Sequence, residues 1–227
     1  MTANSINNLE VRESMIRTCL KMNEVGINQG TSGNLSVRIA DGFLITPSSI
    51  PYERMQPEDI VEMGFDGSWE GLHIPSSEWR FHRDILVARP ERNVVLHTHS
   101  MYATTLAIHH KEIPAFHYMI AVAGGSTIRC SPYATFGSQE LSDVAVKALE
   151  GRDACLLGQH GQIAIGTTEE KALWLAIEVE TISRMYVQAL SLGEPPVLAD
   201  EEIQRVIEKI KTSGYGLGEK RSAEKVM

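Results

Sequence analysis

The 227-residue sequence predicts an α/β domain in which helices and a β-sheet form packed layers. Short apolar segments typical of strands alternate with longer segments of helical spacing from one end of the chain to the other. No internal repeat and no linker rich in proline, serine or glycine divides the chain, which indicates one domain. The composition, with 43% hydrophobic and 22% charged residues, is that of a globular protein and excludes a disordered one.

The first elements are a helix and a hairpin. Residues 5–24 have helical spacing, with Ser5 as a candidate N-cap and Gly26 just after the end. Apolar strands are expected at 34–39 and 43–46. They flank Asp41-Gly42, a dipeptide that suits a type I′ hairpin turn.

The middle of the chain predicts a helix, a buried strand and a second helix. The first helix begins near Ser76-Ser77 and ends at Pro90, and apolar residues repeat along it at helical spacing. An apolar run within 93–99 indicates a buried strand whose last residues are polar. The next helix is expected at 100–109.

The last third predicts two strands between helices. Ser138 is a candidate cap for a helix that ends at Gly151, and strands follow at 154–157 and 162–166. Further helices are expected at 168–192, where Thr167 and Glu170 have capping-box spacing, and at 200–211. The domain therefore covers 1–211, and the glycine-rich tail 212–227 is expected to be flexible.

Charge and cysteine content exclude several classes of protein. Twenty-one basic against 29 acidic residues give a net charge of −8, which argues against a general nucleic-acid binder but not against a small anionic ligand. The three scattered cysteines argue against a disulfide framework and indicate a reducing cytoplasm. Neither a signal peptide nor an apolar run long enough to cross a membrane is visible.

Three histidines form a candidate metal site. His97 and His99 lie two residues apart on the expected strand, so their side chains project to the same face. His160 lies in a tight turn between two later strands. Three neutral imidazoles suit Zn²⁺ and leave a position for an oxygen ligand or substrate. The alternative for the His-x-His pair is two partly exposed histidines at a strand end.

Two donor-rich segments accompany these histidines. Pro75-Ser76-Ser77-Glu78 opens a helix, where unpaired amides and hydroxyls can bind an anion and Glu78 could serve as metal ligand or base. A capped helix start with a favourable acidic residue is the alternative. The segment 30–34 could also cradle a phosphate, although a glycine-rich loop is weak evidence alone.

Together these segments resemble the class II aldolase and adducin family. The similarity spans nearly the whole chain and is carried by segments 28–38, 50–53, 75–82, 97–99, 113–120, 132–137 and 171–176. It implies a single-domain α/β/α sandwich with a central, largely antiparallel sheet. It also implies a zinc-dependent aldolase that reversibly cleaves a ketose 1-phosphate, of the L-fuculose 1-phosphate kind, to dihydroxyacetone phosphate and a short aldehyde such as L-lactaldehyde.

The resemblance assigns roles to residues of this chain. Zn²⁺, one per subunit, would be held by His97, His99 and His160, with Glu78 either completing the coordination or acting as catalytic acid/base. Tyr118 would transfer a proton in a neighbouring subunit's site, within a homotetramer that has sites at its interfaces. The substrate phosphate would be bound by Gly33, Asn34, Ser48, Ser49, Ser76 and Ser77.

The sequence departs from the family in three places. Ser48-Ser49 stands where relatives that cleave this sugar have Thr-Gly, and serine adopts some glycine conformations only at a cost. Gln159 replaces a histidine before the third zinc ligand. Tyr215 is the nearest match to an assisting tyrosine of the C-terminal tail, but the spacing there is shifted.

Other activities share the family's fold. Aldolases of 5-deoxyribulose or methylthioribulose 1-phosphate differ only in substrate, and a dehydratase and a 4-epimerase are also known. The epimerase is disfavoured because its members resemble aspartate at the position of Glu78. A non-catalytic adducin-like module would be expected to lack the histidines. A structural zinc site would have no reason to lie beside two anion-binding segments.

Overall fold

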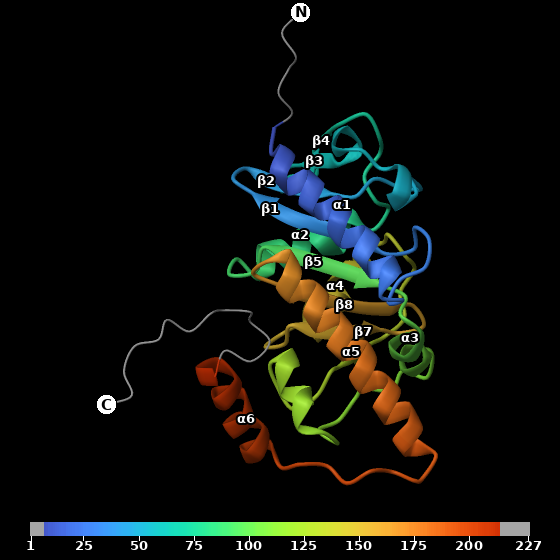
Figure 1. Ribbon diagram of the computed structural model, residues 1–227, viewed down its shortest axis with the longest axis vertical. Coiled ribbons are helices and arrows are strands. Elements are labelled where there is room, and N and C mark those ends of the chain that lie inside the picture. Colours follow the sequence, from blue (N-terminus) through green and yellow to red (C-terminus); the bar gives the residue numbers. More distant parts are fainter. Residues whose placement is uncertain (1–6, 214–227) are drawn as a thin grey trace, which may run out of the picture.

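The computed structural model describes residues 7–213, which form one eight-stranded sheet with helices on both faces (Figure 1). The strands are β1 (Asn34–Ile39), β2 (Gly42–Ile45), β3 (Val61–Met63), β4 (Trp69–Glu70), β5 (Val94–Thr98), β6 (Cys130–Ser131), β7 (Ala154–Leu157) and β8 (Gly161–Gly166). The α-helices are α1 (Leu9–Glu24), α2 (Trp79–Ala88), α3 (Met101–Ile108), α4 (Gln139–Ala148), α5 (Glu169–Leu190) and α6 (Asp200–Ser213). The 3₁₀ helices are η1 (Tyr52–Arg54), η2 (Pro57–Asp59) and η3 (Tyr118–Ala123).

The sheet has the order β4-β3-β2-β1-β5-β8-β7-β6. Within residues 7–213, the pairings are antiparallel except for β6 with β7, which are parallel. The layered α/β class and the largely antiparallel sheet are therefore confirmed.

Side chains of the central strands alternate between two hydrophobic layers. Leu96 of β5 packs in the layer that holds the apolar faces of α1, α3 and α5. Its neighbour Val95 packs in the opposite layer, with α2 and α4. Figure 1 shows α1 and α5 crossing one face of the sheet, with α2 and α4 behind it. Because both faces are covered, β5 is buried along its whole length.

The expected β1–β2 hairpin is present, but its turn is not of type I′. Ile39 pairs with Gly42, so the turn residues are Ala40 and Asp41, and neither has the positive φ that type I′ requires. Gly42 has a different role. A Cβ there would lie 2.1 Å from the carbonyl oxygen of Met63, so glycine permits the close approach of β3.

Helix ends differ from expectation at α1, α5 and α6. Helix α1 begins at Leu9, not at residue 5, because its N-cap Asn8 has a left-handed φ of 57°. The N-cap of α5 is Thr168, whose hydroxyl accepts from the amide of Lys171, so the expected capping box of Thr167 and Glu170 does not form. The expected cap of α4 is confirmed, since the Ser138 hydroxyl accepts from the amide of Leu141. Helix α6 continues to Ser213. Ser5, Tyr215 and the rest of the tail lie outside the described residues.

The cysteines and helix lengths bear on the class of protein. Cys19, Cys130 and Cys155 are free thiols. Burial raises the pKa of all three, to about 11 for Cys130, so they stay protonated at neutral pH. No helix among residues 7–213 combines the length and apolar character needed to span a membrane.

Candidate functional site

Three histidines converge at the end of β5. His97 and His99 come from β5 and its next residues, and His160 comes from the turn between β7 and β8. One ring nitrogen from each lies within 4.8 Å of the other two. The ring centroids are 4.7 to 4.9 Å apart. The structure thus brings together the three residues that the sequence singled out.

One left-handed residue and one close backbone approach hold the cluster together. Gln159 has a φ of 54°, a left-handed conformation that turns the chain between β7 and β8 and presents His160. Gly161 follows, and a Cβ there would lie 2.4 Å from the Thr98 carbonyl oxygen and 2.9 Å from His99 Cδ2. Glycine therefore lets β8 start directly against the end of β5.

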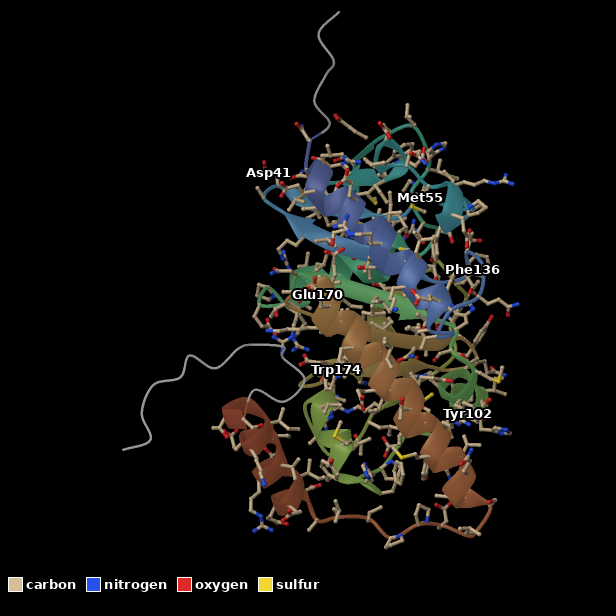
Figure 2. All side chains as sticks on the ribbon, viewed as in Figure 1. Asp41, Met55, Tyr102, Phe136, Glu170 and Trp174 are labelled. Carbon is tan, nitrogen blue, oxygen red and sulfur yellow. The ribbon has the colours of Figure 1, made fainter. Side chains whose placement is uncertain are left out.

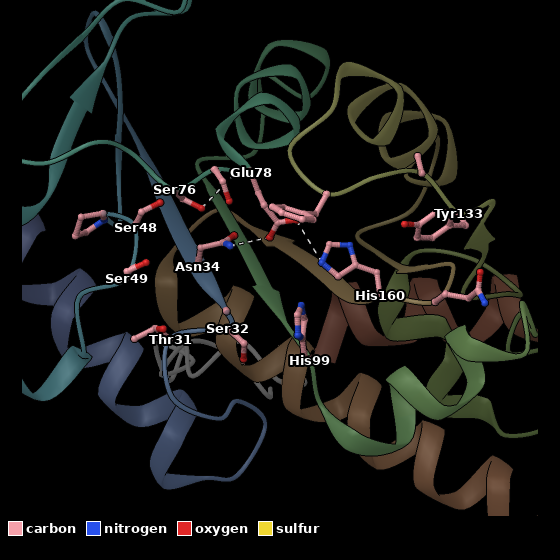
Figure 3. Close-up of a pocket in the computed structure, with 16 residues that line it drawn as sticks. Thr31, Ser32, Asn34, Ser48, Ser49, Ser76, Glu78, His99, Tyr133 and His160 are labelled. Carbon is pink, nitrogen blue, oxygen red and sulfur yellow. Dashed lines mark hydrogen bonds and ion pairs between the residues drawn. The ribbon is translucent and has the colours of Figure 1, made fainter.

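Glu78 lies beside these rings. It is the N-cap residue of α2, yet its side chain makes no capping hydrogen bond. Its Oε2 lies 3.4 Å from His97 Nε2. Its Oε1 lies 3.3 Å from His160 Nε2 (Figure 3). Asn34 Nδ2 donates a hydrogen bond of 3.0 Å to Glu78 Oε2. Glu78 is only 5% exposed, so protein atoms determine the surroundings of its carboxylate.

The chemistry of these donors fits a divalent metal ion. His97 Nδ1 lies 2.9 Å from the carbonyl oxygen of Gln162, to which it donates, so Nε2 carries the lone pair. His97 Nε2 and Glu78 Oε1 are buried without a hydrogen-bond partner. Burial lowers the pKa of His97 and of His160 to about 3, so both rings are neutral. A cation would satisfy the unpartnered atoms, and neutral imidazoles are its usual ligands.

A polar cavity of about 380 Å³ opens above the cluster. Figure 3 shows the serine-rich segments on one side of the histidines and Tyr133 on the other. The six residues predicted to bind phosphate line this cavity together with Glu78, His99 and His160, namely Gly33, Asn34, Ser48, Ser49, Ser76 and Ser77. Segments far apart in the sequence therefore present hydroxyl groups to one cavity. Figure 2 shows all side chains on the ribbon.

The loop with Ser48-Ser49 keeps a backbone conformation that favours glycine. Ser49 has a φ of 63°. The loop is tied to the segment before α2, since the Ser48 hydroxyl donates to the Pro75 carbonyl at 3.1 Å and the Ser76 amide donates to Thr46 at 3.0 Å. These bonds offset the cost of a serine in the left-handed region.

Position 33 requires glycine because there is no space for a side chain. A Cβ there would lie 2.6 Å from both Asn28 Oδ1 and the carbonyl oxygen of His97. The Tyr52 hydroxyl donates to the Gly33 carbonyl at 2.5 Å. The donor-rich loop is consequently packed directly on the strand that carries the histidines.

The structure leaves some predicted residues outside this cavity. Tyr118 is 47% exposed at the start of η3 and lines a separate cavity against α6. Within one chain it is therefore not part of the histidine site. Tyr215 lies outside the described residues.

Sequence reasoning also missed residues that line the cavity. Tyr133, Phe136 and Gln159 line it, and no role was predicted for them. Thr31 and Ser32 also line it, and they were predicted only as part of the donor-rich segment 30–34. Tyr133 and Phe136 belong to an irregular segment between β6 and α4, where no periodic pattern indicates which side chains face the site. Their presence adds an aromatic wall to a polar cavity.

Comparison with known proteins gives consistent matches. A family model described as "Class II Aldolase and Adducin N-terminal domain" matches residues 13–187. An L-fuculose phosphate aldolase of Escherichia coli strain K12 is 49% identical over 211 residues, which cover 92% of this chain and 98% of the relative. A 5-methylthioribulose-1-phosphate/5-deoxyribulose-1-phosphate aldolase of Rhodospirillum rubrum is also 49% identical, over 206 residues covering 91% and 93%.

Solved structures agree with these matches. An L-fuculose 1-phosphate aldolase structure has a TM-score of 0.88 at 39% identity and covers 92% of this chain and 100% of its own. An L-fuculose-1-phosphate aldolase from Thermus thermophilus has a TM-score of 0.71 at 26% identity and covers 83% and 100%. Both likenesses extend over most of the fold described above.

The packing at Gly161 predicts how the histidines respond to a small change. In Gly161→Ala, the new methyl group would press on the Thr98 carbonyl and the His99 ring. We expect the affinity for Zn²⁺ or Co²⁺ to fall by at least about tenfold, because displaced ligands lose coordination geometry. Isothermal titration calorimetry on metal-depleted protein measures this.

Gly151→Ala is the control for a loss of stability that does not reach the histidines. Gly151 has a φ of 65° and open space around its Cβ position, so alanine there costs stability of about 1 kcal/mol without touching the histidines. Its metal affinity should equal that of the wild type. Equal affinities for all three proteins would contradict the role given to Gly161.

Proposed function

Because this chain belongs to the class II aldolase and adducin family and is a metal-dependent sugar-phosphate aldolase, we propose that it cleaves an L-fuculose 1-phosphate-like ketose 1-phosphate. The reaction is reversible, and its products are dihydroxyacetone phosphate and a short aldehyde such as L-lactaldehyde. The observation that carries this proposal is the convergence of His97, His99, His160 and Glu78 beneath a cavity lined with hydroxyl groups.

The metal in this proposal is zinc, one per subunit. His97, His99 and His160 hold it through neutral ring nitrogens, and Glu78 is the nearest carboxylate available to them. When bound, a divalent cation supplies positive charge that stabilises the negative charge developing on the ketose oxygens during cleavage.

The serine-rich side of the cavity binds the phosphate of the substrate. Hydroxyl and amide donors hold a phosphate without a basic side chain, which agrees with an acidic protein. The residues in this role are Gly33, Asn34, Ser48, Ser49, Ser76 and Ser77, and they line one cavity. Binding there orients the carbon chain so that its reacting atoms lie over the histidines.

Glu78 transfers the proton on the dihydroxyacetone phosphate side. After the C3–C4 bond breaks, C3 must gain a proton, and Glu78 in its protonated form is the acid beside the site. The proton that the C4 hydroxyl loses during cleavage balances this transfer. Its carboxylate lies 3.3 to 3.4 Å from two imidazoles and is held by Asn34. A buried and oriented carboxyl group suits general acid–base catalysis.

Tyr118 acts on the aldehyde side, from a neighbouring subunit of a homotetramer. Its half-exposed ring lies away from the cavity of its own chain, so it is free to enter another. There its hydroxyl exchanges a proton with the C4 oxygen of the substrate. The complete site then requires two subunits.

A second substrate class has comparable support. The Rhodospirillum rubrum relative, named for 5-methylthioribulose 1-phosphate and 5-deoxyribulose 1-phosphate, is as similar as the fuculose phosphate relative. These sugars share C1 to C3 with L-fuculose 1-phosphate and differ in the aldehyde portion. The phosphate and metal residues would serve either class, so the aldehyde side of the cavity must decide between them.

The cytoplasm is the compartment we propose for this reaction. The three cysteines are unpaired, and two of them are fully buried thiols. Reduced cysteines of this kind are typical of a reducing compartment.

Product analysis on a panel of sugars tests the proposed substrate. L-Fuculose 1-phosphate, 5-deoxyribulose 1-phosphate and 5-methylthioribulose 1-phosphate should each release dihydroxyacetone phosphate, with the highest kcat/KM for the first. A coupled reductase assay measures the release. A higher kcat/KM for either deoxypentulose assigns the second class, and no release from any of them contradicts the proposed function.

Glu78→Gln separates proton transfer from metal binding. The amide keeps the shape of the side chain but cannot deliver the proton, so we expect zinc to remain bound while kcat falls by about 100-fold or more. Metal analysis and the same assay measure both quantities. His97→Ala is the matched variant and should lose zinc as well as activity. Near-normal turnover of Glu78→Gln would exclude the proton-transfer role.

A mixing experiment tests catalysis across subunits. Tyr118→Phe and His97→Ala should each be nearly inactive alone. In a random equimolar co-assembly, about a quarter of the sites combine an intact histidine cluster with an intact neighbouring tyrosine, so activity should return. Mixed oligomers, verified by affinity tags, that stay inactive would show that Tyr118 does not act in a neighbouring site.

A further inference from the structure

A line of four buried polar side chains leads away from the metal site. Ser36 Oγ lies 2.7 Å from His82 Nδ1, and His82 Nε2 lies 2.5 Å from Asn34 Oδ1. Asn34 Nδ2 donates at 3.0 Å to Glu78 Oε2. Ser36 and His82 are fully buried, and Asn34 and Glu78 are 5% exposed. The line connects the sheet interior to the carboxylate beside the histidines.

The chemistry of the groups sets a direction along this line. Asn34 presents its amide hydrogens to the carboxylate, so its oxygen must accept from His82. His82 then carries its proton on Nε2, which leaves Nδ1 to accept from the hydroxyl of Ser36. Every donor in the line points toward Glu78. Burial keeps the pKa of His82 well below its ordinary value, so the ring is neutral and can both accept and donate.

We propose that His82 and Ser36 are positioning residues for the aldolase reaction, which act through Asn34 to hold the Glu78 carboxylate. In the opposite orientation of the asparagine amide, its oxygen would face the carboxylate and repel it. His82 excludes that orientation because its Nε2–H needs the oxygen as acceptor. Ser36 in turn donates its hydroxyl proton to Nδ1, which stabilises the tautomer of His82 with the proton on Nε2. The inference rests on the proposed function of Glu78 and extends it to two residues that do not touch substrate.

Local structure explains why these residues meet. Asn34 and Ser36 are two apart on β1, so both project to the same face of the sheet. Glu78 and His82 are four apart at the start of α2, so they lie on the same side of that helix. Asn34 pairs with His97 in the register of β1 with β5. The line therefore lies between α2 and the sheet and ends at the metal site.

The position of the ring proton provides a test that does not depend on activity. We suggest ¹⁵N solid-state NMR on the zinc-loaded full-length protein labelled with ¹⁵N-histidine, with the His82 signals assigned by their loss in His82→Gln. Protonated and unprotonated ring nitrogens differ clearly in chemical shift. A proton on Nε2 alone is expected. A proton on Nδ1, or on both nitrogens, would overturn the proposal because Asn34 could not then have the described orientation.

Kinetics of Ser36→Ala test the consequence for catalysis. Loss of one hydroxyl leaves the fold but removes the donor to His82. We expect kcat to fall by about tenfold, with KM changed by less than about twofold and zinc content unchanged. Ser183→Ala is the matched control, because Ser183 is also fully buried and donates to a backbone carbonyl, that of Val179 in α5. Equal kcat losses in the two variants would contradict a positioning role.

Two variants of His82 complete the test. Glutamine can donate from a position close to that of Nε2, whereas leucine cannot, so His82→Gln should retain at least about tenfold more activity than His82→Leu. Equal activities would overturn the proposal. If His82→Leu does not fold, the NMR result and the kinetics of Ser36→Ala still test the proposal. Absence of aldolase activity in the wild type would contradict the proposed function, while the ring proton would still test the line itself.

Discussion

The register of β5 between β1 and β8 determines the geometry of the site. His97 lies opposite Asn34 on one side and opposite Ile163 on the other. This pairing places the first residue of β1, the end of β5 and the turn with His160 together at one end of the central strands. A slip of one residue would transfer His97 to the face that packs on α5 and would bring Thr98 into the site. Continuous apolar packing on both faces of β5 prevents such a slip.

Polar groups are concentrated where this packing ends. Buried imidazoles and a buried carboxylate are unfavourable unless hydrogen bonds or a cation satisfy them. The Gln162 carbonyl satisfies one nitrogen of His97, and Asn34 satisfies one oxygen of Glu78. The remaining lone pairs face one another. The stability of the fold therefore offsets the cost of burying these groups. Their remaining lone pairs are satisfied only when a positive ion lies among them.

Patterns within single elements were predictable from sequence, and contacts between elements were harder to predict. Alternation along a strand was enough to pair His97 with His99, whereas His160 was a candidate only because of its turn. The type I′ turn was wrong because Gly42 serves the approach of β3, a contact between distant segments. The short strands β3, β4 and β6 have only two or three residues, too few for a pattern. No link between Ser36 and His82 was predicted from the sequence. Residue spacing can show which side chains share a face, but only the packing of α2 on β1 shows that the two faces meet.

The edges of the sheet limit how copies of this protein can associate. The outermost strands, β4 and β6, have two residues each, and Pro132 directly follows β6. Strands this short offer few free backbone groups, and proline cannot donate a hydrogen bond, so another strand has little to pair with. Growth by sheet extension is thereby suppressed, which protects against fibrous aggregation. Any association between copies would instead use side chains of helices and loops, where shape selects the partner.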